Sequence, residues 1–322
     1  MDRSKIVIVR GVFSDDIGKL IIQRGYCWCQ FFKKQSNFFL RSVRRVWNKL
    51  NLPGKSIWYD KKILSVDSQE IVIMDALCNV EYLTWLRKKK PNAKIVFWYW
   101  NIAKNSIPPY KIPDGLVDKW SFSRKDCAKY GMRFNPLPYF SELAYSSEQK
   151  EFDIVFVGKD KGRLDMLLKL KADFESLGLN TKFVITPDHP YSNHPAYSKP
   201  ISYLESVQLD TKAKAVLDYI EIDDSGQSLR ILESIFIKEK IITNSKLIFD
   251  YDFYCPENFF VLGHDDLSEL PKFISTPYKN LSDDIVRKYD FDYIVGRFFS
   301  DEYTIFDEML KKMMEKSDIG AK

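Results

Sequence analysis

The sequence of 322 residues has few cysteines and histidines, and none of them forms a recognised metal-binding pattern. Its five cysteines are scattered, and Cys27 and Cys29 are one residue too close for the usual zinc pair. The three histidines, His189, His194 and His264, have no cysteine nearby. This scarcity excludes the common zinc modules, so we expect no metal site and reduced structural thiols in a cytosolic protein.

Several other site types are missing as well. No run of 18 apolar residues occurs, which argues against a transmembrane helix. The start, MDRSKIVIVRG, lacks the apolar region and cleavage site of a signal peptide, so we expect a cytoplasmic location. No GxGxxG follows the first strand, and GxxxxGK[ST], GxSxG and HExxH are absent. We therefore expect no NAD, FAD or metal cofactor, no P-loop and no hydrolase nucleophile.

The charge of the chain is divided unevenly between its halves. Residues 1–150 hold 27 Lys and Arg against 13 Asp and Glu, a net charge of +14. Residues 151–322 hold 22 against 31, a net charge of −9. Such an asymmetry predicts two domains with different partners, the first of them facing an anionic surface.

Short apolar runs alternate with helical periodicity in both halves, which is typical of parallel α/β sheets. The first half offers strands at 5–11, 55–60, 71–76 and 94–101, and the second half offers strands at 153–158, 181–186, 215–220, 240–243 and 258–263. A polar stretch at 141–151 is the expected linker. We therefore predict two Rossmann-like domains facing across a cleft, residues 1–145 and 152–300, with a helical tail at 301–322.

Residues 24–50 interleave aromatic and basic side chains. A basic amphipathic segment with Trp and Phe suits the headgroup level of an anionic membrane. A core helix with a solvated basic face explains the same pattern equally well. Nucleic acid ranks third because no RNP, helix-turn-helix or zinc pattern accompanies the charge. We expect peripheral attachment to the inner face of the plasma membrane and no nucleic-acid partner.

Polar residues of the second half gather at predicted strand ends and helix starts, where open α/β sheets bind ligands. Gly158 allows close approach of backbone to a ligand, and Lys159, Lys161 and Arg163 offer cations beside a helix start suited to a diphosphate. The stretch 215–245 adds a second helix start, for which Ser225 is the expected N-cap. Its polar candidates are Asp218, Gln227, Ser228, Arg230, Glu233 and Asn244. Glu233 has two interpretations, a carboxylate that accepts from ribose hydroxyls and a partner for Arg230 within one helix.

The first half offers carboxylates for acid–base chemistry. Asp15 and Asp16 follow the first predicted strand, and Asp75 ends another strand. A general base must be a positioned group of this kind. For Asp15 and Asp16, capping of the next helix is the competing interpretation.

The second half resembles a family of bacterial glycosyltransferases encoded with lipopolysaccharide, O-antigen and capsule synthesis. The matching runs are Val216-Leu217-Asp218, Gln227-Ser228-Leu229-Arg230, Leu232-Glu233, Lys240-Ile241-Ile242-Thr243-Asn244 and Tyr251-Asp252-Phe253-Tyr254. KIVFWYWN in the first half and FVGKDKGR in the second are also similar to that family. The chain departs from the pattern where Gly-Leu-Thr is replaced by Ser228-Leu229, and where Ile242 replaces one of two threonines.

The resemblance implies a GT-B fold, with the nucleotide-sugar donor in the second domain and the acceptor in the first. It gives Glu233 to the donor ribose, Lys159 and Arg163 to the diphosphate, and residues 227–230 to the phosphate or sugar. The Glu-x7-Glu pattern of many retaining enzymes is absent, because Ser225 stands at the first position unless Asp223 or Asp224 serves. Retention and inversion of the sugar therefore both stay open.

The expected activity is metal-independent transfer of a hexose or deoxyhexose from a nucleotide diphosphate to a hydroxyl of a surface glycan or glycolipid. For an inverting reaction, Asp16, Asp15 and Asp75 are the candidate bases in that order. A non-catalytic scaffold of the same fold in polysaccharide assembly is the alternative. A nucleotide-sugar epimerase is a third reading, against which the three histidines argue.

Overall fold

The computed structural model describes residues 2–11, 15–34, 37–50, 52–75, 78–144, 149–220 and 226–319. Its contacts divide the chain into two compact units, Met1–Pro136 with Val295–Lys322, and Leu137–Ile294. The boundaries at 145, 152 and 300 stay a prediction about domains. The contacts add that the C-terminal segment belongs with the first unit. No helix in the described ranges combines the length and apolar composition needed to cross a bilayer.

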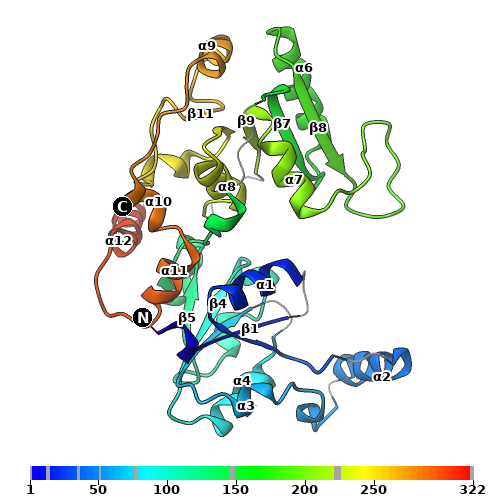
Figure 1. Ribbon diagram of the computed structural model, residues 1–322, viewed down its shortest axis with the longest axis vertical. Coiled ribbons are helices and arrows are strands. Elements are labelled where there is room, and N and C mark those ends of the chain that lie inside the picture. The colour runs from blue at the N-terminus through cyan, green and yellow to red at the C-terminus, as the bar shows by residue number, and fades with distance from the viewer. Residues whose placement is uncertain are drawn as a thin grey trace. The chain divides into compact units, whose positions relative to one another are not determined.

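The first unit contains an all-parallel sheet of six strands in the order β2-β1-β3-β4-β5-β6. Its strands are β1 (Ile6–Arg10), β2 (Cys27–Gln30), β3 (Glu70–Met74), β4 (Lys94–Tyr99), β5 (Asp118–Ser121) and β6 (Arg133–Phe134). Its helices are α1 (Asp15–Gln23), α2 (Phe38–Lys49), α3 (Lys62–Ser65), α4 (Val80–Lys89), α5 (Arg124–Tyr130) and α12 (Ile305–Ile319). Figure 1 shows α2 extending from the rest of this unit.

The second unit contains a five-stranded parallel sheet in the order β11-β10-β9-β7-β8. Its strands are β7 (Phe152–Lys159), β8 (Thr181–Thr186), β9 (Ala213–Asp218), β10 (Lys240–Thr243) and β11 (Phe259–Val261). Its helices are α6 (Leu164–Ser176), α7 (Tyr203–Asp210), α8 (Leu229–Ile237), α9 (Leu270–Ser275) and α10 (Asp283–Arg287), while α11 (Phe291–Arg297) spans the division between the units. The prediction of two Rossmann-like α/β domains is confirmed by these two sheets.

Both sheets follow one winding plan. In each, the first strand lies between the second and the third, so the order reverses between β1 and β3 and again between β7 and β9. Ligands of open α/β sheets bind outside the carboxyl ends of the strands at such a reversal. The central strands are apolar throughout because helices cover both of their faces, and Ile6, Val7, Ile8 and Val9 are fully buried.

The C-terminal segment packs on the first sheet through aromatic rings and one arginine. The ring of Phe298 meets the edges of Trp98 and Trp120 at centroid distances of 4.9 and 5.1 Å. The Arg297 guanidinium donates to the Phe134 carbonyl at 3.0 Å and to Asp307 at 2.8 Å. Residues from the far end of the sequence thus complete the core of the first unit.

The expected strand at 55–60 is wrong. Lys55–Ile57 forms a 3-10 turn after Gly54, whose φ of 76° places it in the left-handed region. Tyr59 is buried, and its ring meets Tyr82 and Trp85 at centroid distances of 5.0 and 5.2 Å. The aromatic residues that suggested a strand instead pack as a cluster against α4.

Candidate functional site

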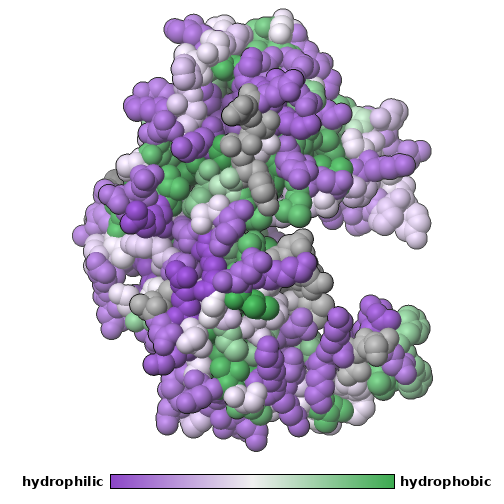
Figure 2. All heavy atoms as spheres, in the orientation of Figure 1, coloured by the Kyte–Doolittle hydropathy of each residue, from purple (hydrophilic) through white to green (hydrophobic). Residues whose placement is uncertain are grey.

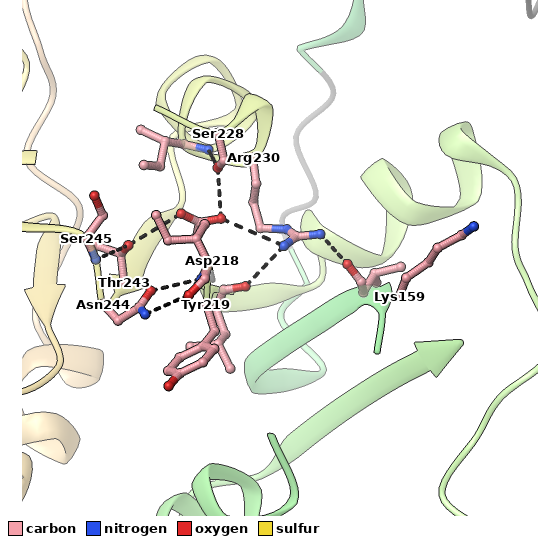
Figure 3. A network of polar contacts seen from close by, with 12 residues as sticks. Lys159, Asp218, Tyr219, Ser228, Arg230, Thr243, Asn244 and Ser245 are labelled. Carbon is pink, nitrogen blue, oxygen red and sulfur yellow. Dashed lines mark hydrogen bonds and ion pairs between the residues drawn. The ribbon is translucent and has the colours of Figure 1, made fainter. Parts of the chain in front are cut away.

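The carboxyl ends of β7, β9 and β10 bring together residues that are far apart in the sequence (Figure 3). Asp218, the last residue of β9, is 2% exposed, and its register partner on β10 is Thr243. The Asp218 carboxylate accepts from the Ser228 hydroxyl at 2.8 Å and from the Thr243 hydroxyl at 3.4 Å. Asp218 therefore joins the two strand ends to the start of α8.

The N-cap of helix α8 lies three residues later than the sequence suggested. This cap is Ser228, whose hydroxyl accepts from the Ile231 amide at 3.3 Å. The expected cap, Ser225, lies outside the described residues, as do the other members of the loop 221–225. Since the Ser228 hydroxyl caps the helix and also donates to Asp218, α8 is tied directly to the strand end.

Gln227, just before this cap, is buried and carries a donor that is unpaired among the described residues. Its side-chain Oε1 accepts from the Tyr251 hydroxyl at 2.6 Å, and its backbone amide donates to the same hydroxyl at 3.1 Å. Its Nε2 is buried and donates to no acceptor in the described chain. An unpaired buried donor at a helix start is suited to an oxygen-rich ligand.

Arg230 lies beneath the strand ends rather than in solvent. Its guanidinium donates to the Val157 carbonyl and, at 3.5 Å, to the Leu217 carbonyl, and it lies 5.4 Å from the centre of the Phe156 ring. Its distance to the Asp218 carboxylate is 4.0 Å. Arg230 therefore links β7 to β9 and supplies positive charge to the carboxylates around it.

Glu233 is buried on α8 and is only partly satisfied. It is 7% exposed, and its Oε1 accepts from the Tyr203 hydroxyl at 2.8 Å. Its Oε2 accepts no hydrogen bond from the part of the chain that the structure describes. Burial raises the pKa of Glu233, while the charge of Arg230 and the Tyr203 hydrogen bond oppose that rise. Among the described residues, one oxygen of this carboxylate is therefore left without a donor.

The turn between β7 and α6 differs from the expected diphosphate seat. The Asp160 carboxylate accepts from the amides of Arg163 and Leu164, both at 2.8 Å, and from the Tyr197 hydroxyl at 2.6 Å. The pKa of Asp160 is lowered, chiefly by the Tyr197 hydrogen bond. The start of α6 is therefore already capped by a carboxylate of the chain itself, which the sequence analysis missed.

Arg163 also has partners other than the expected phosphate. Its guanidinium donates to the carbonyls of Lys159 at 2.7 Å and Asp160 at 3.0 Å, and to the Tyr219 carbonyl. These contacts join the β7 turn to the end of β9. The side chains of Lys159 and Lys161 stay exposed at the same turn.

Packing against Phe156 explains why glycine stands at position 158, at the end of β7. A Cβ built on Gly158 would lie 3.1 Å from the Phe156 ring. The guanidinium of Arg163 lies 5.8 Å from the centre of the same ring. Glycine at this position leaves room for the ring over which Arg163 and Arg230 lie.

Asn244 is used as a backbone clamp. Its Oδ1 accepts from the Ile220 amide at 2.9 Å, and its Nδ2 donates to the Ile220 carbonyl at 2.8 Å. Its side-chain amide therefore holds the chain as it leaves β9, and the predicted role of Asn244 in donor binding stays a prediction.

A further buried carboxylate, Asp210, lies at the end of α7 and was not predicted as a site residue from the sequence. It is 1% exposed, and its Oδ1 has no hydrogen-bond partner among the described residues. Burial raises its pKa to about 7, with Glu233 adding to the rise and Arg230 opposing it. Arg230 is thus a nearby cation for all three of Asp210, Asp218 and Glu233, and Arg163 also acts on Asp218.

The candidate bases belong to the first unit. Asp75 follows β3, and its carboxylate accepts from the Trp100 amide at 3.1 Å and from the Asn101 side chain at 3.4 Å. Burial raises the pKa of Asp75. Asp15 and Asp16 are the first residues of α1, while their side chains lie outside what the structure describes.

No protein-family model matches the sequence, and no curated protein matches it. The chain is similar in structure to Anabaena HepE in complex with UDP and glucose, at 9% identity and a TM-score of 0.44, over 97% of this chain and 99% of that one. It is also similar to an alpha1,3-fucosyltransferase, at 12% identity and a TM-score of 0.45, over 94% and 91%. A glycosyltransferase from Rickettsia africae ESF-5 matches at 11% identity and a TM-score of 0.41, over 96% of both chains.

Proposed function

We propose that the protein is a glycosyltransferase of the GT-B type, which moves a sugar from a nucleotide diphosphate to a hydroxyl of a bacterial surface glycan. The observation that carries this proposal is the convergence of Asp218, Ser228, Arg230 and Glu233 at the strand-order reversal of the second sheet. These residues belong to the runs on which the resemblance to surface-glycan glycosyltransferases rests. A ligand bound there meets a free carboxylate oxygen, a buried amide donor and two exposed lysines.

The geometry supports a division of roles among these residues. The Oε2 of Glu233 accepts from the donor ribose, and Gln227 Nε2 donates to a phosphate or sugar oxygen. Lys159 and Lys161 neutralise the diphosphate, and Arg163 positions the turn that carries them. Asp218 and Asn244 hold the helix start and the strand exit in place. Positive side chains supply the charge stabilisation, so the proposed transfer is metal-independent.

In an inverting reaction, the acceptor oxygen forms a bond to the anomeric carbon as the bond to the donor phosphate breaks. The electron pair of the broken bond leaves with the diphosphate, next to Lys159 and Lys161. The hydroxyl proton passes to a carboxylate of the first unit, for which Asp16, Asp15 and Asp75 are the ordered candidates. The transferred sugar is proposed to be a hexose or a deoxyhexose. Substrate screening will identify that sugar, the nucleotide of the donor and the acceptor.

The decisive experiment measures nucleotide binding and sugar release with a panel of UDP-, GDP-, CMP- and dTDP-sugars, each with and without EDTA. We expect one nucleotide to bind, and Glu233→Gln to weaken binding about 10-fold because a charged hydrogen-bond acceptor is lost. Glu257→Gln is the matched control, since Glu257 is a surface residue paired with Lys279 at 2.7 Å. If the protein binds none of these nucleotides, the glycosyltransferase proposal is rejected. Binding without transfer to any acceptor would favour the non-catalytic scaffold.

The proposal includes peripheral attachment to the cytoplasmic face of an anionic membrane through α2. Residues 17–59 contain nine Lys and Arg and no Asp or Glu. On α2, Phe39 (70% exposed) and Val46 lie two turns apart on one face, and Leu50, the C-cap, follows one turn later. Arg41, Arg45 and Lys49, spaced four residues apart, form an exposed basic stripe. Figure 2 shows hydrophobic and hydrophilic side chains together on this helix, which is the composition of an interfacial helix.

A further inference from the structure

At the strand-order reversal of the first sheet lies an arginine, Arg10, that has no anionic partner among the described residues. Arg10 ends β1, which lies between β2 and β3, and Asp75 follows β3. Ligands of a doubly wound sheet lie outside the strand ends at this reversal. Arg10 and Asp75 therefore flank the position at which a ligand of the first unit is expected.

The Arg10 side chain is half-buried, and one of its guanidinium nitrogens has no hydrogen-bond acceptor among the described residues. It lies 5.5 Å from the centre of the Trp100 ring, and its Nη1 is buried and donates to no acceptor among the described residues. Burial lowers the pKa of Arg10, and no ion pair with a carboxylate of the described residues opposes that change. By contrast, Arg163 and Arg230 each donate to backbone carbonyls. A buried charge without a partner costs free energy, which a bound anion would recover.

The half-buried indole of Trp100 adds a donor and no acceptor, whereas Trp98, against which it packs, is fully buried. Trp98 and Trp100 lie edge to face at a centroid distance of 5.1 Å, and the Nε1 of each is buried without a partner in the described chain. The backbone amide of Trp100 donates to the Asp75 carboxylate at 3.1 Å. The residue whose ring lies next to Arg10 is therefore hydrogen-bonded to the candidate base. A site with unpaired donors of this kind is matched by a ligand rich in anionic oxygen.

We propose that Arg10 and Trp100 form a subsite for an anionic group, a carboxylate or a phosphate, carried by the acceptor. This inference rests on the proposed function, because it makes the first unit the acceptor-binding one. The guanidinium presents a planar fork of donors that pairs with two oxygens of such a group. The acceptor class is then an acidic glycan, either one with a uronic-type sugar acid or one with a phosphate substituent.

The test compares thermal unfolding of the full chain with methyl glucuronoside, inorganic phosphate and methyl glucoside, at an ionic strength held constant with NaCl. We expect one or both anions to raise the Tm and the neutral glucoside to leave it unchanged. A rise with the glucuronoside identifies the carboxylate, and a rise with phosphate alone identifies the phosphate. A Tm that responds to neither anion overturns the inference.

Two variants locate the effect. Arg10→Met is expected to weaken the anion affinity about 10- to 100-fold, because a charged hydrogen-bonded pair is lost. Arg133→Met is the matched control, because the exposed Arg133 guanidinium also lies over an indole, 4.0 Å from the centre of the Trp120 ring. This control variant is expected to keep the full rise in Tm with the anion. An undiminished response in Arg10→Met overturns the inference.

The stability of the ligand-free variant gives an independent readout. If Arg10 serves ligand binding and not the fold, Arg10→Met is expected to unfold at the same Tm as the wild type or at a higher Tm, because an uncompensated charge is removed. A strongly lowered Tm, or failure to fold, makes Arg10 a structural residue and overturns the inference. Arg10→Lys, which keeps the charge without the planar fork, is expected to retain part of the affinity.

Nucleotide binding separates this inference from the proposed function. Wild-type protein that binds a nucleotide diphosphate but no acidic acceptor analogue rejects the Arg10 subsite and leaves the glycosyltransferase in place. Wild-type protein that binds the anion through Arg10 but no nucleotide rejects the glycosyltransferase instead. If Arg10→Met weakens nucleotide and anion affinity equally, the anion belongs to the donor, and the acceptor subsite is overturned.

Discussion

The Tyr203 hydroxyl donates a 2.8 Å hydrogen bond to Oε1 of Glu233, joining α7 to α8 thirty residues further along the chain. Tyr203 thereby fixes one oxygen of a buried carboxylate and leaves the other for a ligand. In that arrangement the hydroxyl positions Glu233 and also stabilises its ionised form.

Replacement of Tyr203 by phenylalanine should weaken donor binding through Glu233. We expect the donor KM of Tyr203→Phe to rise about 3- to 10-fold at pH 7, with kcat little changed, because one hydrogen bond to a charged group is lost. The hydroxyl lowers the pKa of Glu233, so its removal raises that pKa and moves the pH midpoint of donor binding upward. Tyr191→Phe, at a 96% exposed position, is the control. An unchanged pH profile would separate Glu233 from donor binding.

Asp210 should make the protein less stable as the pH rises. Its pKa is raised from 3.8 to about 7 in the folded chain, so between these values the folded state holds a proton that the unfolded state has lost. The stability that this proton brings is present at low pH and disappears as the pH approaches 7. Asp210→Asn should remove that loss, with a gain of at most about 4 kcal/mol in the free energy of unfolding at pH 8.

Urea unfolding between pH 4 and pH 8 measures this difference. The two proteins should be close in stability at pH 4 and diverge as the pH rises. Asp173→Asn, on the surface of α6, should show no such divergence. A variant that is less stable than the wild type at every pH would mean that the Asp210 carboxylate stabilises the fold instead.

The parallel sheets could be predicted because their central strands are apolar on both faces. β3, β4, β9 and β10 agree with the expected strands within about two residues. The edge strand β2 was missed because Cys27–Gln30 is short and mixed in polarity. The strand expected at 55–60 was wrong because the aromatic residues there pack in a tertiary cluster against α4 and do not join a sheet.

The position of the site could be predicted, while several roles within it could not. Strand ends of a parallel sheet meet at one edge, which is why Asp218, Asn244 and residues 227–233 were expected together. The local roles depend on side-chain geometry that spacing does not encode. Asp160 caps the helix that was expected to receive a phosphate, and Asn244 clamps Ile220. The partners from α7 gave no sequence signal, because Tyr203 and Asp210 lie outside every motif.

The exposed lysines of the β7 turn should govern affinity for the diphosphate. We expect Lys159→Gln with Lys161→Gln to weaken binding of the nucleotide diphosphate about 10-fold and to leave binding of the free nucleoside unchanged. Lys169→Gln with Lys171→Gln removes the same charge from α6, where both lysines pair with acids four residues away. Calorimetric titration of all three proteins makes the comparison. Equal losses for diphosphate and nucleoside would place the lysines outside the phosphate contact.

The candidate bases can be ranked by turnover and stability together. We expect Asp16→Asn to lower kcat about 100-fold or more with the fold intact, as for loss of a general base. Asp75→Asn should lower stability as well as turnover, because both of its carboxylate oxygens accept hydrogen bonds within the first unit. Asp114→Asn, at an exposed position, is the control. Full turnover in Asp16→Asn would transfer the role to Asp15 or Asp75.

Attachment to the membrane should require the basic and the apolar stripes of α2 together. Sedimentation with anionic liposomes should fall steeply between about 0.05 and 0.5 M NaCl, because the attraction is screened by salt. Arg41→Gln with Arg45→Gln should lose most of the binding, and Phe39→Ser with Val46→Ser should lose the part that survives high salt. Lys311→Gln with Lys312→Gln removes two exposed charges from α12 of the same unit and should bind normally. If the α2 variants instead abolish self-association and leave liposome binding intact, the apolar stripe serves a second copy of the chain, and the membrane assignment fails.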